Sequence, residues 1–188
     1  MSTLSIEHLS VSAGEKQLLS DISLTLQSGE MHILMGPNGS GKSSLLNALM
    51  GHPRYTITEG KMVLDGEEIT SLSTEKKAKL GLFLSLQHLP EIAGVTLTNF
   101  LHRAAKEVKG STQGPLEFYR ASEAKAKEAG IDPVFLKKHV NTGLSGGEKK
   151  QSEVLQLLIL EPKFAFLDEI DSGVDVDAMK KVYAGIER

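Results

Sequence analysis

The chain has 188 residues, of which 40% are hydrophobic and 24% charged, so it is long enough for one domain with a sizeable buried core. Its formal net charge of −3 gives no bulk attraction to nucleic acid or to an anionic membrane, and we expect neither a nucleic-acid partner nor direct membrane insertion. Without any cysteine, disulfides and thiolate metal sites are excluded, and no apolar run approaches the roughly 18 residues of a membrane span. These features predict a cytoplasmic protein.

The first half of the chain alternates apolar runs with turn residues. Such runs predict strands at five places: 4–11, 18–26, 31–35, 61–70 (a hairpin around Asp65-Gly66) and 81–86. The run at 31–35 is short and continuous, as in a buried strand. Residues 43–50 predict a helix that ends at Gly51.

From residue 96 the pattern becomes helical. Helices are predicted over 98–108 and 118–130, separated by a loose loop at 110–115, and we expect a helical subdomain inserted at about 90–145. A helix over 146–160 then stops at Glu161-Pro162, and the apolar run 164–167 predicts a strand.

Between the predicted strand 31–35 and the helix that follows lies a glycine-rich loop of the form G-x-x-x-x-G-K-[ST]. Glycines let successive backbone N–H groups turn inward around an anion, and the helix adds its positive N-terminal end. In such a loop Lys42 reaches the β and γ phosphates and Ser43 supplies a ligand to Mg²⁺. A glycine-rich helix cap is the plainer alternative, but the strand–loop–helix order favours a site for the phosphates of a nucleotide. The candidate phosphate-binding residues are Gly36, Pro37, Asn38, Gly39, Ser40, Gly41, Lys42, Ser43 and Ser44.

Two carboxylates follow the apolar strand predicted at 164–167. Open α/β sheets bind ligands at the carboxyl ends of their strands, so Asp168 is placed to hold Mg²⁺. Glu169 is placed to orient the water that attacks the γ phosphate, or to accept its proton. An acidic cap for the next helix is the alternative, and the loop at 36–43 argues against it.

The stretch Leu144-Ser145-Gly146-Gly147-Glu148 predicts a capping box, in which Ser145 and Glu148 satisfy each other's backbone N–H groups. Two glycines after the cap cost a helix about 1 kcal/mol each, which makes sense if a ligand must approach the backbone. Ser145, Gly146 and Gly147 therefore form a second candidate anion site. The two sites can share one nucleotide only by facing each other across a dimer.

These motifs, in this order, resemble the ATP-binding cassette (ABC) ATPases. The family's motifs correspond to a Walker A loop at 36–43, a Q-loop glutamine at Gln87, the signature at 144–148, a Walker B strand at 164–169 and a D-loop at 170–175. The resemblance implies an α/β P-loop NTPase fold, with a mainly parallel sheet core, an N-terminal antiparallel β subdomain and a helical subdomain.

Longer strings resemble the SufC branch of this family, the ATPases of Suf iron–sulfur cluster assembly. They lie at 51–60, 90–96, 146–150 and 160–173. Transport cassettes more often carry glutamine where Glu148 stands. The partners so implied are SufB/SufD-like scaffold proteins.

The resemblance also implies a mechanism. Two copies form a transient ATP-dependent homodimer, in which Ser145 of one copy meets the γ phosphate held by Lys42 of the other. Glu169 and Gln87 take catalytic roles, and Ser43, Gln87 and Asp168 hold Mg²⁺.

Two departures from the family are visible. No aromatic residue precedes Tyr55, so the adenine base must rest on apolar contacts. No histidine follows Asp175, although the family places a switch histidine beyond the D-loop, so we expect a C-terminally incomplete product whose ATPase activity is open. The leading hypothesis is an ATPase of iron–sulfur assembly; the alternatives are the ATPase subunit of a membrane transporter and a nucleotide-binding module without turnover.

Overall fold

The computed structural model describes residues 1–85 and 90–168. These residues divide into two units, each with its own hydrophobic core. The first unit contains residues 1–84 and 163–168, and the second contains residue 85 and residues 90–162.

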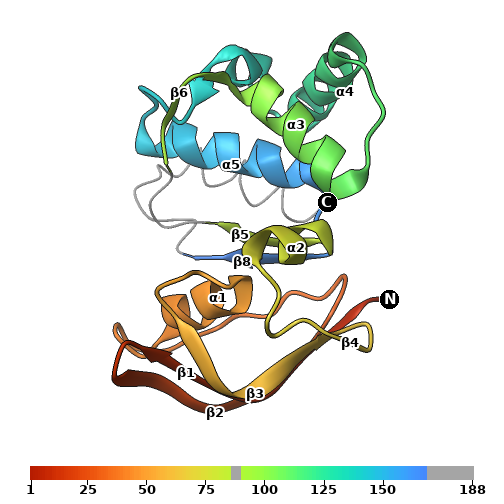
Figure 1. Cartoon of the computed structure of the whole chain (residues 1–188). Helices are drawn as coiled ribbons and strands as arrows, with labels where there is room; N and C mark the ends of the chain where they lie inside the picture. The colour runs from red at the N-terminus through yellow and green to blue at the C-terminus, as the bar shows by residue number, and fades with distance from the viewer. Residues whose placement is uncertain (86–89, 169–188) are drawn as a thin grey trace. The chain divides into compact units, whose positions relative to one another are not determined.

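An antiparallel sheet of four strands forms much of the first unit (Figure 1). Its strands are β1 (Thr3–Ala13), β2 (Lys16–Gln27), β3 (Thr56–Leu64) and β4 (Glu67–Glu68), in the order β2-β1-β3-β4. Asp65 and Gly66 turn the chain from β3 to β4 with positive φ angles of 51° and 88°, which suits a two-residue hairpin turn. The hairpin predicted around Asp65-Gly66 is confirmed, and the strands predicted at 4–11 and 18–26 are present as β1 and β2, which pair with each other.

Helix α1 (Lys42–Met50) lies over one face of this sheet (Figure 1). The first unit also contains α2 (Thr74–Lys79), β8 (Phe164–Leu167) and all but the last residue of β5 (Leu82–Ser85), and β5 pairs with β8 in a separate two-stranded sheet. Leu45 and Leu49 of α1 belong to the same buried cluster as Phe166 of β8. One core therefore supports both the helix after the glycine loop and the strand before Asp168.

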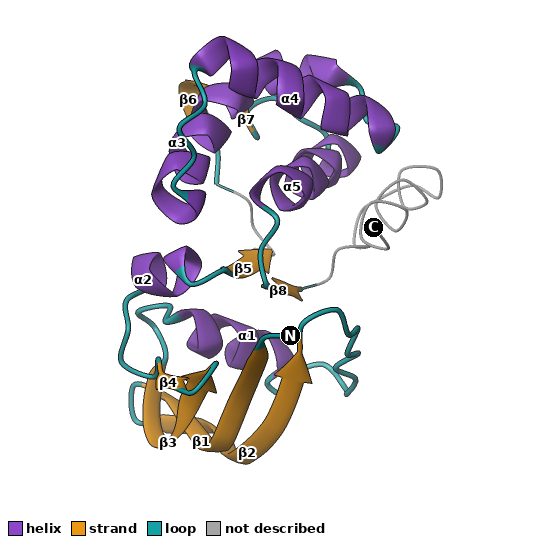
Figure 2. Cartoon of the chain, turned by 90° about the vertical axis from the view of Figure 1, so that its right-hand side faces the viewer, coloured by secondary structure: helices purple, strands orange, loops and turns teal. Residues whose placement is uncertain are grey.

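The second unit is mainly helical (Figure 2). Its elements are β6 (Ile92–Thr96), α3 (Leu97–Lys109), α4 (Pro115–Glu128), the 3₁₀ helix η1 (Pro133–Lys137), β7 (His139–Val140) and α5 (Gly146–Leu160). Helix α5 packs against both α3 and α4, and Leu101, Phe118 and Leu155 from these helices share one buried cluster. The three helices predicted in this region are confirmed.

The strand predicted at 31–35 is wrong. These residues join no ladder among the described strands, and Met31, Ile33 and Met35 are 69%, 79% and 84% exposed. A buried strand needs hydrogen-bonded neighbours, and an apolar run shows only that a segment suits such a place. Four further elements were not predicted from the sequence, and none of them is longer than six residues: α2, β6, β7 and η1.

Candidate functional site

The glycine loop at 36–41 leads directly into α1. Gly41 is the N-cap residue, in the left-handed region with φ 97°, and no side chain caps the helix. A Cβ atom at Gly41 would lie 2.5 Å from Cδ2 of Leu19 on β2, so a larger residue would have to displace this methyl group as well as adopt the positive φ angle that favours glycine. The N-terminal end of α1 thus keeps its backbone donors for a ligand, as an anion site requires.

Lys42 folds back over this loop. Its Nζ donates to the carbonyl oxygens of Gly36 (2.8 Å) and Pro37 (3.0 Å), while the Ser40 amide donates to Pro37 O (3.2 Å). The ammonium of Lys42 is therefore held at the loop by two carbonyl oxygens, and phosphate oxygens can take their place as hydrogen-bond acceptors. Ser43 and Ser44 follow in the first turn of α1 and are partly exposed. A lysine, backbone N–H donors and a hydroxyl together fit a nucleoside triphosphate with its Mg²⁺.

Asp168 comes directly after β8 and is 7% exposed. Because the cores of β8 and α1 are one cluster, the structure brings this carboxylate and the Walker A helix into the same unit. Carboxylate and hydroxyl oxygens are suitable ligands for Mg²⁺. Glu169 and Gln87, the two predicted catalytic residues, lie outside the described residues.

The signature turn at 144–148 lies in the second unit, at the start of α5. The predicted capping box is confirmed: Ser145 N donates to Glu148 Oε2 (2.8 Å), and Glu148 N donates to Ser145 Oγ (3.3 Å). Gly146 and Gly147 occupy the first turn of α5, where no Cβ atom shields their backbone.

Lys138 was not foreseen from the sequence. Its Nζ donates to Glu148 Oε1 at 2.8 Å, across ten residues that include β7 and the signature turn. Hydrogen bonds from Lys138 and then from Ser145 lower the pKa of Glu148 to about 2. No periodic pattern links the two positions, so only the folded loop reveals the pair.

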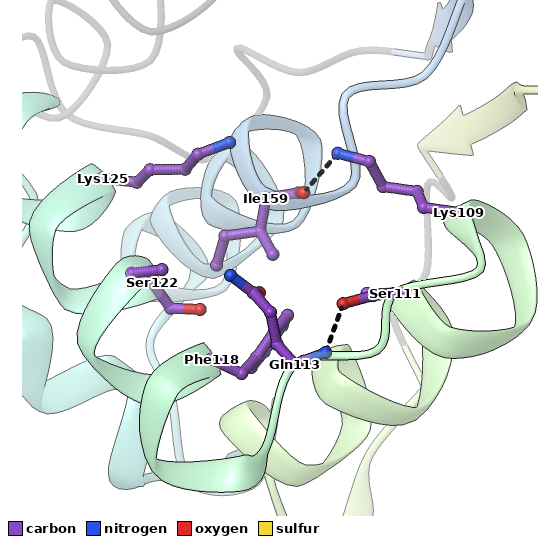
Figure 3. A pocket seen from close by; sticks show the side chains of 9 residues that line it. Lys109, Ser111, Gln113, Phe118, Ser122, Lys125 and Ile159 are labelled. Atoms are coloured by element: carbon purple, nitrogen blue, oxygen red, sulfur yellow. Dashed lines mark hydrogen bonds between the residues drawn. The ribbon is translucent and has the colours of Figure 1, made fainter.

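A pocket of about 210 Å³ lies among α3, α4 and α5 (Figure 3). Ser111, Gln113 and Phe118 line it together with Lys109 and Lys125. Both lysines also bind Glu161, so their charges are already paired. This pocket contains none of the residues predicted to bind ATP.

In the parts of the chain that the structure describes, no helix is both long and apolar enough to cross a membrane. Over the same residues, no cluster of three or more histidine, aspartate or glutamate side chains is arranged to bind a metal ion.

Comparison with known proteins identifies the family. Residues 19–172 match the family described as ABC transporter. The chain belongs to the ABC ATP-binding proteins. Members of this family bind ATP, generally with Mg²⁺, and generally hydrolyse it.

Several curated relatives match nearly the whole chain. Vegetative protein 296 of Bacillus subtilis is 43% identical over 100% of this chain and 72% of its own length. A probable ABC transporter ATP-binding protein of Streptococcus pyogenes is 45% identical over 99% of this chain and 73% of its own length. The probable ATP-dependent transporter ycf16 of Antithamnion sp. is 42% identical over 95% of this chain and 73% of its own length.

Solved structures support the fold. A nucleotide-free ATP-binding cassette from an ABC transporter superposes with a TM-score of 0.76 at 21% identity, covering 100% of this chain and 76% of the other. An ATP-binding subunit of an ABC transporter gives 0.81 at 22% identity, covering 98% and 73%. The fold is therefore that of the ABC nucleotide-binding domain, an α/β fold with an antiparallel N-terminal sheet.

Proposed function

We propose that this ABC protein is the SufC-type ATPase of a cytoplasmic iron–sulfur cluster assembly system and that it drives a SufB/SufD-like scaffold by ATP-dependent dimerisation. The sequence strings at 51–60, 90–96, 146–150 and 160–173 support this choice within the family. In the structure, Glu148 and Lys149 of the string 146–150 form ion pairs with Lys138 and Glu91, respectively.

The Walker A geometry is the observation that carries the ATPase proposal. The N-terminal end of α1 and Lys42 bind the β and γ phosphates, with the ammonium leaving the carbonyl oxygens of Gly36 and Pro37. Ser43 and Asp168, together with Gln87, would hold Mg²⁺, which when bound neutralises charge on the phosphates.

Hydrolysis then needs one water and one base. Glu169 orients the water and takes its proton as the water oxygen bonds to the γ phosphorus; the bond from that phosphorus to the bridging oxygen breaks, leaving ADP and phosphate. The signature turn of a second copy, with Ser145 and the first amides of α5, meets the γ phosphate and completes the site. We further propose that the helical subdomain at about 90–145 passes this closure to the scaffold.

The ATPase subunit of a membrane transporter is the second candidate, and the names of the Streptococcus and Antithamnion relatives favour it. The two functions differ in the partner that the chain binds. The tagged chain should retain a purified SufB/SufD pair on a column in the presence of Mg-ATP. Failure to bind that pair, together with recovery of a detergent-solubilised membrane protein, would decide for the transporter.

Replacing Lys42 tests the nucleotide site itself. The Lys42→Ala variant should lose calorimetric binding of Mg-ATP by at least about a hundredfold, because a charged hydrogen-bond donor to the phosphates is removed. Lys16→Ala removes an exposed lysine from the start of β2 and should bind as the wild type does. Unchanged affinity in Lys42→Ala would exclude Lys42 from phosphate binding, and binding without phosphate release in the wild type would indicate a module without turnover.

A further inference from the structure

Glu148 places a full negative charge at the start of α5. Its carboxylate accepts from Ser145 N at 2.8 Å, in the turn where an anion is stabilised by the helix dipole. The proposed function requires a second anion, the γ phosphate, to reach the same turn. A bare carboxylate at this position would repel that phosphate.

Lys138 lies on the other side of this carboxylate. Its Nζ is 2.8 Å from Glu148 Oε1, and the same ammonium is 4.8 Å from the centre of the Phe135 ring. Both side chains of the ion pair are about one-third exposed, at 37% for Lys138 and 34% for Glu148. Ring and carboxylate together hold the ammonium in one place.

The neighbouring lysines have other partners. Lys149 pairs with Glu91 at 2.8 Å, and Lys137 lies 5.8 Å from the centre of the Tyr119 ring. Of these three lysines, Lys138 is therefore the one that forms an ion pair with Glu148.

We propose that Lys138 is a positioning residue for the signature turn: it neutralises Glu148 and holds it on the Ser145 amide, so that the turn can accept the γ phosphate of ATP bound to a second copy. This inference rests on the proposed function, and specifically on closure of two copies around ATP. All contacts that carry it lie within the second unit.

The neutral counterpart of Glu148 provides the discriminating test. A glutamine side chain can accept from Ser145 N through its amide oxygen but carries no charge to be neutralised. A lysine at 138 is then unnecessary for phosphate approach. Lysine and glutamate thus act as a matched pair, and removing both should do less harm than removing the lysine alone.

The experiment measures dimer formation by sedimentation velocity with Mg²⁺ and a non-hydrolysable ATP analogue, and nucleotide affinity by calorimetry. Lys138→Met should weaken the nucleotide-dependent dimer about ten- to hundredfold, the range for losing a hydrogen bond between charged groups, with calorimetric affinity unchanged. Lys138→Arg should keep the dimer, and Lys138→Met combined with Glu148→Gln should restore it. Lys137→Met removes a neighbouring charge without touching Glu148 and should dimerise normally.

A Lys138→Met dimer as strong as the wild type overturns the inference, and so does a double variant as weak as the single one. If the wild type binds the analogue without dimerising, closure itself is wrong, and the proposed mechanism fails with the inference that rests on it. Circular dichroism of each variant shows whether the helical content of the chain is retained.

Discussion

Lys77 is the most completely buried charged side chain in the first unit. It has no exposed surface, and its Nζ donates to Leu49 O (2.9 Å) in the last turn of α1, with Met62 Sδ at 4.0 Å. The C-terminal end of a helix favours a cation, but burial removes the ammonium from water. Burial is the stronger effect and lowers the pKa of Lys77 to about 8.

This shift predicts an unusual pH dependence of the free energy of unfolding. Between pH 8 and 10.5 the unfolded chain keeps the proton that the folded chain releases, so raising the pH stabilises the folded state, by at most about 3 kcal/mol. Chemical denaturation at pH 8 and pH 10 should show this rise in the wild type and not in Lys77→Met. Lys76→Met, which removes an exposed lysine of the same helix, should follow the wild type. Parallel curves for all three proteins would mean that Lys77 does not titrate in this range.

At the scale of single residues, the sequence predicted roles that depend on neighbours along the chain. Ser145 and Glu148 are three residues apart, and their capping box is confirmed. Lys77 stands beside Lys76 in a run that has the character of a solvated surface, and nothing local distinguishes the buried lysine from the exposed one. The partners of Lys77 and Lys138 come from other elements, 28 and 10 residues away, which only the fold brings close.

Among the elements, α5 carries the signature turn at one end and leads to β8 at the other. Glu161 caps its C-terminus in the left-handed region, with φ 46°. Lys109 of α3 and Lys125 of α4 both bind this carboxylate, and they also donate to the carbonyl oxygens of Ile159 (3.5 Å) and Leu158 (2.9 Å) (Figure 3 shows the first of these). Two lysines thus cap the last turn of α5 and join three helices.

Replacing Glu161 with glutamine tests this cap. Hydrogen bonds from Lys109 and then Lys125 lower the pKa of Glu161, so its contribution to stability is present above the ordinary pKa of 4.5 and is lost as the pH falls through the lowered value. Because Glu161 is 58% exposed, Glu161→Gln should reduce the free energy of unfolding at pH 7 by only about 1 kcal/mol. Denaturant titrations should show the two proteins converging at acid pH.

Glu123 provides the control for this prediction. It pairs with Lys127 within α4 alone, so Glu123→Gln should cost less than about 0.5 kcal/mol. A loss in Glu161→Gln no larger than in Glu123→Gln would contradict a three-helix cap.

Elements with a local signature were predicted well, and elements that depend on distant pairing were not. Helix α5 and strand β8 have the predicted bounds. The helix cap, the apolar periodicity and the residues that end the helix all lie close together along the chain, so the sequence alone indicates them. The pairing of β6 with β7 joins Ile92 to Val140, and no sequence pattern announces it. The segment 31–35 shows the opposite error, a predicted element that is absent. Its apolar composition predicted a buried strand, but it pairs with no strand among the described residues.

Across the whole molecule, the two hydrophobic cores share no residue, and the order of elements along the chain does not indicate which of them belong to which core. Residues 163–168 belong to the unit formed by residues 1–84. Asp168 therefore lies in the same unit as the Walker A helix, although the described residues of the second unit separate the two in the sequence. The order of motifs predicted that Asp168 and Lys42 serve one nucleotide, but apolar patterning gave no indication of which distant stretches share a core.

This division predicts that Mg-ATP stabilises the first unit directly. At a ligand concentration a hundredfold above the dissociation constant, binding adds about 2.7 kcal/mol to the free energy of unfolding. The chain has three tyrosines and no tryptophan, and Tyr55 packs on the first core while Tyr119 packs on the second. Tyrosine fluorescence of the Tyr119→Phe/Tyr183→Phe variant should therefore report a higher melting temperature with Mg-ATP.

The companion Tyr55→Phe/Tyr183→Phe variant reports on the second unit in the same titration. Its transition should shift less, because the residues proposed to bind the nucleotide in one copy, Lys42, Ser43 and Asp168, all belong to the first unit. Adding Lys42→Ala should abolish the shift at Tyr55. A shift that survives Lys42→Ala would place the bound nucleotide away from the Walker A loop, and a larger shift at Tyr119 than at Tyr55 would move its main contacts to the second unit.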